Sequence, residues 1–112
     1  MNEISNMNEL RPFTLWAANA IEKTLQIKDE LNYPAWESLT HAQRYIAMSE
    51  EFEEVQEAIS GVLIEEKRTP EAIAHLQAEL CDLAVTAFML SGGFDEKISS
   101  LKRGRIDNEQ RK

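Results

Sequence analysis

The feature that most constrains the fold of this chain is a set of helix start and stop signals spaced along it. Thr40 and Gln43 form a capping-box pattern, in which each side chain can bond the backbone N–H of the other residue. The tripeptide Thr-Pro-Glu at residues 69–71 is a second start signal, with an N-cap, a proline at the first helical position and an acid at the positive end of the helix dipole. Asn-Tyr-Pro at residues 32–34 interrupts an earlier helix, and the two glycines at 92–93 can end a later one with a left-handed cap.

These signals predict four helices, at about residues 13–31, 40–65, 70–91 and 95–105. No segment of four or more residues alternates between apolar and polar positions as a strand would. Short connections favour antiparallel neighbours, so we predict an all-α, four-helix bundle-like single domain over residues 1–112. Four short helices leave a groove open on one side, and we therefore expect the bundle to oligomerise as a homodimer or homotetramer.

Composition narrows the range of partners. The formal net charge of −8 argues against a nucleic acid polymer, because binding phosphates along a strand needs clustered Lys and Arg. The longest apolar stretch, around residues 83–90, is far short of the roughly 20 residues that cross a bilayer, and the first residues lack the pattern of a signal peptide. Cys81 is the one cysteine and excludes an internal disulfide. We expect a cytoplasmic protein that does not enter the membrane.

The segment SEEFEEVQEAI carries unusually dense negative charge for a helix. No Lys or Arg occurs between residues 45 and 66, and like charges four apart on a helix cost roughly 0.2–0.5 kcal/mol per pair. Taken alone, such a run is ordinarily a solvated helix face. Five glutamates fall within eight positions: Glu50, Glu51, Glu53, Glu54 and Glu57.

A second acidic pair, Glu79 and Asp82, repeats the pattern of Glu51 and Glu54 in the following helix. Each pair lies one turn apart beside an apolar stripe, so four carboxylates can converge when helices pack about 8–10 Å apart. A divalent cation would relieve their repulsion, and oxygen-only ligands favour Mg²⁺ or Mn²⁺ over zinc. The two stripes, expected in the core, are Met48, Phe52, Val55 and Ile59, and Leu76, Leu80, Leu83 and Ala87.

The paired motifs resemble those of a known family. Residues 50–54 match E-E-x-x-E, and Glu79 and Asp82 match E-x-x-D after 24 intervening residues. This pattern resembles the MazG-like all-α nucleoside triphosphate pyrophosphatases, a group that includes dimeric dUTPases, dCTP pyrophosphatases and phosphoribosyl-ATP pyrophosphohydrolases. The resemblance implies Mg²⁺-dependent hydrolysis of a nucleoside triphosphate to the monophosphate and pyrophosphate. It also implies the metal ligands: Glu51, Glu54, Glu79 and Asp82.

Glu57 and Glu50 lie almost opposite the apolar stripe and point to solvent or to another subunit. They are outer carboxylates that could orient the attacking water, and we name them as catalytic candidates. The sequence departs from the family at Glu53, where glycine is frequent, and in the tail, where a Lys-x-x-x-Asn-x-x-Arg pattern is replaced. Arg103 and Arg111 are the basic residues nearest to that pattern, and they either contact phosphate or belong to a solvated end.

Aromatic residues suggest where a base could bind. Trp36 precedes the second helix and either stacks on the base or closes the end of the bundle. Trp16 and Asn19 in the first helix could line the same pocket, although Trp16 could equally lie in the core. His41 and His75 lack a partner at metal-ligand spacing. The rival to the enzyme hypothesis is a non-catalytic helical bundle that binds a protein partner, or senses nucleotides, through its acidic helix.

Overall fold

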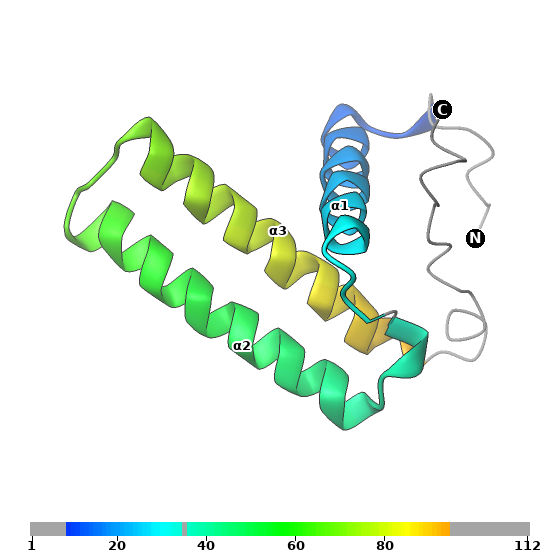
Figure 1. Ribbon diagram of the computed structural model, residues 1–112. Helices are drawn as coiled ribbons and strands as arrows, with labels where there is room; N and C mark the ends of the chain where they lie inside the picture. The colour runs from blue at the N-terminus through cyan, green and yellow to red at the C-terminus, as the bar shows by residue number, and fades with distance from the viewer. Residues whose placement is uncertain (1–8, 35, 95–112) are drawn as a thin grey trace.

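The computed structural model describes residues 9–34 and 36–94, and these residues form helices joined by short loops. Helix α2 (His41–Ile59) and helix α3 (Pro70–Gly92) run side by side as an antiparallel hairpin, while helix α1 (Pro12–Glu30) packs mainly against α3 (Figure 1). Two short elements, η2 (Trp36–Ser38) and the π-helical η3 (Ser60–Ile64), flank α2. The predicted all-α class is confirmed for the described residues. The helix predicted at 95–105 lies outside them.

The predicted helix starts have the expected hydrogen bonds. Thr40 Oγ1 accepts from the backbone N–H of Gln43 at 3.1 Å, and Gln43 Oε1 accepts from the N–H of Thr40 at 2.8 Å. Thr69 Oγ1 likewise accepts from the N–H of Ala72 at 3.1 Å. Both caps satisfy backbone donors that the first helical turn leaves free, so each helix starts where the sequence predicts.

The end of α3 differs from the prediction of a left-handed glycine cap. Gly93 has φ −66°, and the side chains of α2 bind the end of α3 instead. His41 Nε2 lies 2.8 Å from the Gly93 carbonyl oxygen, and the buried Arg44 donates to the carbonyls of Met89 (3.4 Å) and Trp36 (2.8 Å). A Cβ atom at position 93 would collide with the Arg44 guanidinium, so glycine is required here for close approach rather than for a positive φ.

Helix α1 ends in a left-handed cap, at a position the sequence analysis treated only as an interruption. Asn32 has φ +58°, a conformation that asparagine tolerates better than most residues. The N–H of Tyr33 donates to the Lys28 carbonyl at 3.0 Å, and that of Asn32 donates to the Asp29 carbonyl at 3.1 Å. These two bonds define a Schellman motif, which fixes Tyr33 next to Lys28.

The core of a single chain is thin. Among the described residues only three apolar side chains, Val55, Val62 and Val85, are buried, and fifteen large hydrophobic side chains are exposed. The prediction that Phe52 and Leu80 lie in the core is wrong for a single chain, since they are 51% and 43% exposed. These residues need a further apolar surface to become buried.

Helix α3 is the most apolar element. By length and composition it could cross a membrane, and 11% of the tested stretch is buried. The central helices of soluble proteins pass the same test.

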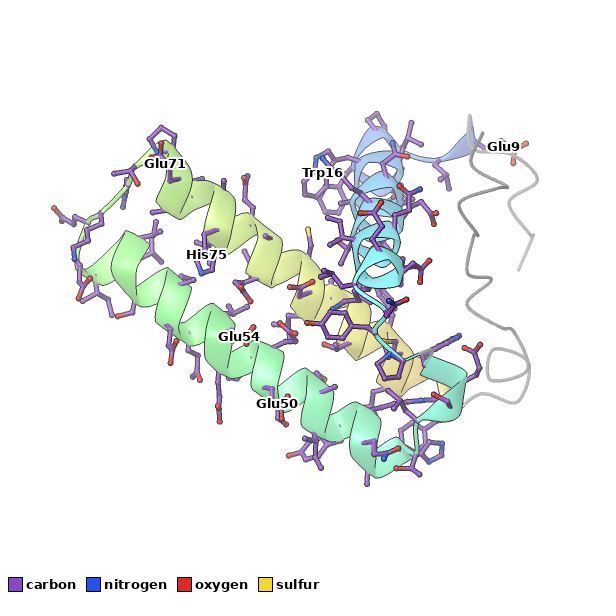
Figure 2. All side chains as sticks on the ribbon, in the orientation of Figure 1. Glu9, Trp16, Glu50, Glu54, Glu71 and His75 are labelled. Carbon is purple, nitrogen blue, oxygen red and sulfur yellow. The ribbon has the colours of Figure 1, made fainter. Side chains whose placement is uncertain are left out.

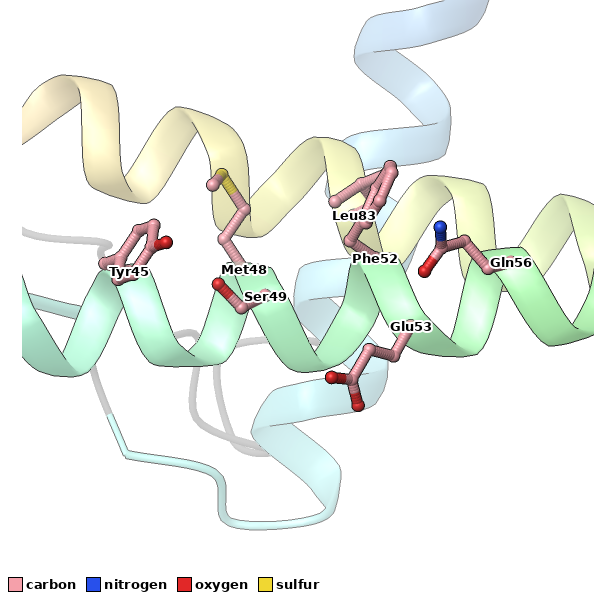
Figure 3. A pocket seen from close by; sticks show the side chains of 7 residues that line it. All are labelled: Tyr45, Met48, Ser49, Phe52, Glu53, Gln56 and Leu83. Carbon is pink, nitrogen blue, oxygen red and sulfur yellow. The ribbon is translucent and has the colours of Figure 1, made fainter.

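Residues of α2, together with Leu83 of α3, line an open groove of about 420 Å³, and Tyr45 and Phe52 are exposed in it. Figure 3 shows this groove along the hairpin, with α1 behind it. Its lining residues are Tyr45, Met48, Ser49, Phe52, Glu53, Gln56 and Leu83.

Candidate metal centre

Three carboxylates from the two motif helices converge between α2 and α3. Glu51 of α2 and Glu79 and Asp82 of α3 each offer an oxygen atom, and these atoms all lie within 4.8 Å of one another. Glu79 and Asp82 are three residues apart, so they share one face of α3, and the antiparallel partner α2 brings Glu51 to the same place. The structure thus assembles three of the four residues predicted as metal ligands.

The fourth predicted ligand, Glu54, lies at the open edge of this cluster. It is an exposed residue on α2, yet its carboxyl group interacts with those of both Glu51 and Glu79. It is not one of the three groups whose oxygens all lie within 4.8 Å of each other. Glu54 can therefore join the cluster through a small change in side-chain conformation.

The cluster is short of positive charge. Burial, then contact with Glu54 and the negative charge of Asp82, raises the pKa of Glu51 to about 7. Burial and the same two acids also raise the pKa of Glu79. One oxygen of each of these residues, Glu51 Oε2 and Glu79 Oε2, is buried without a hydrogen-bond partner. Buried polar atoms are normally satisfied, so these two oxygens are available to accept a hydrogen bond or to coordinate a cation.

The donor set fits a hard divalent cation. Oxygens around an octahedral Mg²⁺ lie about 2.0–2.1 Å from the ion, and therefore roughly 3–4 Å from one another. The spread of 4.8 Å is slightly wider than this, and modest side-chain movement would close it. Only oxygen ligands are present, which suits Mg²⁺ or Mn²⁺ rather than zinc.

Two basic side chains flank the cluster on opposite sides. Lys28 Nζ of α1 lies 3.6 Å from Asp82 Oδ1, and the Lys28 side chain is only 14% exposed. His75 Nδ1 lies 3.9 Å from Glu79 Oε1, but its side chain is 65% exposed. Figure 2 shows His75 on the side of α3 that faces α2. Of these two side chains, Lys28 is the one that the packing of the helices buries beside the cluster.

A pocket of about 230 Å³ opens beside the cluster on the Lys28 side. It contains both charged and apolar groups, and Glu50, one of the two predicted catalytic residues, lines it although Glu50 is exposed. The lining residues are Lys28, Tyr33, Pro34, Leu39, Ala47, Glu50, Glu51, Thr86 and Met89.

Glu57, the other predicted catalytic residue, lies on the His75 side. It is exposed and lines a separate pocket of about 280 Å³ together with His75 and Lys67. Glu50 and Glu57 thus line pockets on different flanks of the cluster. Glu50 directly precedes Glu51 on α2, whereas Glu57 follows Glu51 by six residues, about 9 Å along the helix axis.

The predicted base-binding residues lie away from the pocket. The carbonyl of Trp36 accepts from Arg44, whose guanidinium lies 5.4 Å from the centre of the indole ring. Trp16 is exposed and stacks on Phe13, 5.9 Å between ring centres. It is twelve residues before Lys28 on α1, about 18 Å along the helix axis. Asn19 is also exposed on α1.

None of Trp36, Trp16 and Asn19 lines the pocket beside the carboxylates. Arg103 and Arg111 lie outside the described residues.

Sequence reasoning missed Lys28 and Tyr33, the two residues that join the cluster to the pocket. A signal for their pairing was present. The Asn-Tyr-Pro stop that follows the first helix places Tyr33 five residues after Lys28, which is the spacing of the two contacting positions in a Schellman motif.

Comparisons with protein-family models, with curated proteins and with solved structures found no match to this chain.

Proposed function

We propose that this protein is a Mg²⁺-dependent nucleoside triphosphate pyrophosphohydrolase, which converts a nucleoside triphosphate and water to the monophosphate and pyrophosphate. The observation that carries the proposal is the convergence of Glu51, Glu79 and Asp82, with two of their oxygens buried and unpartnered. The same residues form the paired motifs that resemble the MazG-like family. Structure and motif therefore support the same site by separate routes.

Each acidic residue has a role in this proposal. Glu51, Glu79 and Asp82, joined by Glu54, would hold Mg²⁺ or Mn²⁺. When bound, such an ion lowers the pKa of a coordinated water and offsets the charge of the triphosphate. Glu50 on one flank, or Glu57 on the other, would orient the attacking water and take up its proton.

The first experiment is pyrophosphate release from a panel of ribo- and deoxyribonucleoside triphosphates with Mg²⁺ or Mn²⁺. We expect release by the wild type and a fall of roughly 100-fold or more in Glu54→Gln, since even changes to the groups that hydrogen-bond a metal's ligands cost about 10–100-fold in metal affinity or activity. Glu71→Gln is the matched control, because Glu71 is an exposed acid in the first turn of α3, outside both the carboxylate cluster and the groove. This variant should keep wild-type activity.

No release with any nucleotide from folded protein with metal present would overturn the proposal. It would favour the rival function, a non-catalytic bundle whose acidic helix binds a protein partner or senses nucleotides.

We further propose that the active form is a homodimer or homotetramer. The supporting observation is the thin core, with large apolar side chains exposed on α1, α2 and α3 and along the open groove. Sedimentation velocity at several protein concentrations tests this directly. A monomer at micromolar concentrations, with full activity, would contradict it.

A further inference from the structure

Lys28 occupies an unusual position between the carboxylate cluster and an aromatic ring. Its ammonium group lies 3.6 Å from Asp82 Oδ1 and 4.9 Å from the centre of the Tyr33 ring. A largely buried lysine is costly unless it is paired, so these two contacts explain how the fold tolerates it. They also leave the ammonium at the boundary between the cluster and the pocket, which both Lys28 and Tyr33 line.

The pocket has both charged and apolar lining residues, just as a nucleotide has charged phosphates and an apolar base. Lys28, Glu50 and Glu51 are its charged lining residues, and Glu51 belongs to the carboxylate cluster. The apolar part of the lining includes Pro34, Leu39 and Met89. Its volume of about 230 Å³ is below the roughly 300–1,000 Å³ of pockets that enclose a whole small molecule. It therefore suits the base and sugar, with the phosphates lying outside it toward the carboxylates.

The backbone fixes the pairing of Lys28 with Tyr33. In the Schellman motif the N–H of Tyr33 bonds the Lys28 carbonyl, and Asn32 between them adopts φ +58°. The motif normally brings two apolar side chains into contact at these positions. Here the contact joins an ammonium group to a ring, so one helix end presents both a cation and an aromatic ring to the pocket.

We propose that Lys28 and Tyr33 form the nucleotide-recognition element of this site, with the Lys28 ammonium on the phosphate chain and the Tyr33 ring against the base. This inference rests on the proposed function and names the groups that select its substrate. Lys28 pairs with Asp82 in the structure. A divalent cation held by the carboxylates would weaken this pairing, and the Lys28 ammonium could then bind the phosphate oxygens.

A purely structural role for Lys28 makes a different prediction. If the ion pair with Asp82 serves only to hold α1 against α3, its removal weakens the whole site, and metal and nucleotide binding fall together. If Lys28 competes with the cation for Asp82 and then binds phosphate, the two affinities change in opposite directions. Separate measurements of metal and nucleotide binding decide between these roles.

The test compares Lys28→Met, Lys28→Arg and the control Lys23→Met, an exposed lysine of the same helix. Calorimetry measures Mn²⁺ alone, and then the α,β-methylene analogues of ATP, GTP, CTP and UTP in the presence of Mg²⁺. For Lys28→Met we expect several-fold tighter Mn²⁺ binding, and at least tenfold weaker binding of the analogue that the wild type prefers. Lys28→Arg should recover part of the loss, and Lys23→Met should match the wild type.

The Tyr33 half is tested with Tyr33→Phe and Tyr33→Ala. Stacking on a base contributes enough that Ala should weaken binding of the preferred analogue about tenfold, whereas Phe keeps the ring and should cost less than threefold. Binding of inorganic tripolyphosphate with Mg²⁺ should be unchanged in both variants, because it has no base. Equal losses for tripolyphosphate and the analogue would overturn base stacking.

Failure of this inference can be told apart from failure of the proposed function. Wild-type protein that binds no Mn²⁺ and releases no pyrophosphate would refute the function. Wild-type protein that does both, combined with a Lys28→Met variant that keeps its nucleotide affinity or loses metal and nucleotide affinity equally, would refute only the role of Lys28.

Discussion

The two flanks of the carboxylate cluster each place a basic side chain near an acid, but they differ in how they do so. On one flank, Lys28 reaches Asp82 from a separate helix, is mostly buried and lines the pocket of about 230 Å³. On the other, His75 lies four residues before Glu79 on the same helix, at 3.9 Å, and is mostly exposed.

Only one of these two contacts, that of Lys28 with Asp82, depends on the packing of one helix against another. A pair four residues apart on an exposed helix surface forms without any tertiary structure and contributes about 0.2–0.5 kcal/mol. The Lys28 contact exists only because α1 packs on α3, and it requires the partial burial of the ammonium group. The proposed substrate recognition therefore involves the Lys28 flank rather than the His75 flank.

The largest expected effect comes from the acids that the two flanks contact. Asp82→Asn and Glu79→Gln should each lower Mn²⁺ affinity by at least tenfold and pyrophosphate release by roughly 100-fold or more, because both belong to one cluster. Calorimetry and the release assay measure these effects. A large loss of activity in Asp82→Asn with nearly normal activity in Glu79→Gln would contradict a single shared cluster. It would show that only the acid on the Lys28 flank is needed for function.

The next effect is on the stability of the metal-free protein. The pKa of Glu51, about 7 in the folded chain against an ordinary value of 4.5, means that the folded state holds more protons than the unfolded state between these pH values. Unfolding free energy should therefore decrease as the pH rises from about 4.5 to about 7. The groups facing Glu51 are Glu54 and Asp82, which raise its pKa, and Lys28, which lowers it.

Chemical denaturation in EDTA at several pH values measures this decrease. Saturating Mg²⁺ should reduce or reverse it, because a bound cation favours the charged carboxylates. Glu51→Gln should flatten the metal-free profile. A wild-type profile that rises with pH over this range, with EDTA present, would contradict the electrostatics derived for the cluster.

The smallest effect is expected for His75→Gln. The imidazole is exposed and its contact with Glu79 is long, so Mn²⁺ affinity and pyrophosphate release should change by less than about twofold. The release assay at pH 7.5 is sufficient to measure this. A loss above tenfold would give the His75 flank, and with it Glu57, a direct part in the reaction.

Much of the helical framework could be predicted from the sequence, because its signals are local. The capping box at Thr40 and the Thr-Pro start at Thr69 depend on residues three or fewer positions away, and both were placed correctly. The end of α3 was not, because His41 and Arg44, about fifty residues earlier in the chain, bind it. A contact of that range leaves no local pattern.

The site divides in the same way. The convergence of Glu51, Glu79 and Asp82 follows from helical periodicity and one antiparallel turn, so the paired motifs were enough to predict it. The pocket depends on how α1 lies against α3, and the periodicity of the sequence does not determine this packing. The sequence therefore predicted pocket residues at Trp16 and Asn19, whereas the last turn of α1 lines the pocket through Lys28. Burial of Phe52 was overestimated because a helical stripe gives a direction but not the extent of the surface that covers it.

The left-handed backbone of Asn32 has a consequence for how this chain can change by mutation. Asn32 is not among the residues that line the pocket or form the carboxylate cluster, yet its φ of +58° sets the contact between Lys28 and Tyr33. Glycine at this position would keep the turn, whereas a β-branched residue would strain it by about 1–2 kcal/mol. Under the proposed function, a substitution at position 32 would alter nucleotide preference without replacing any group that touches the substrate.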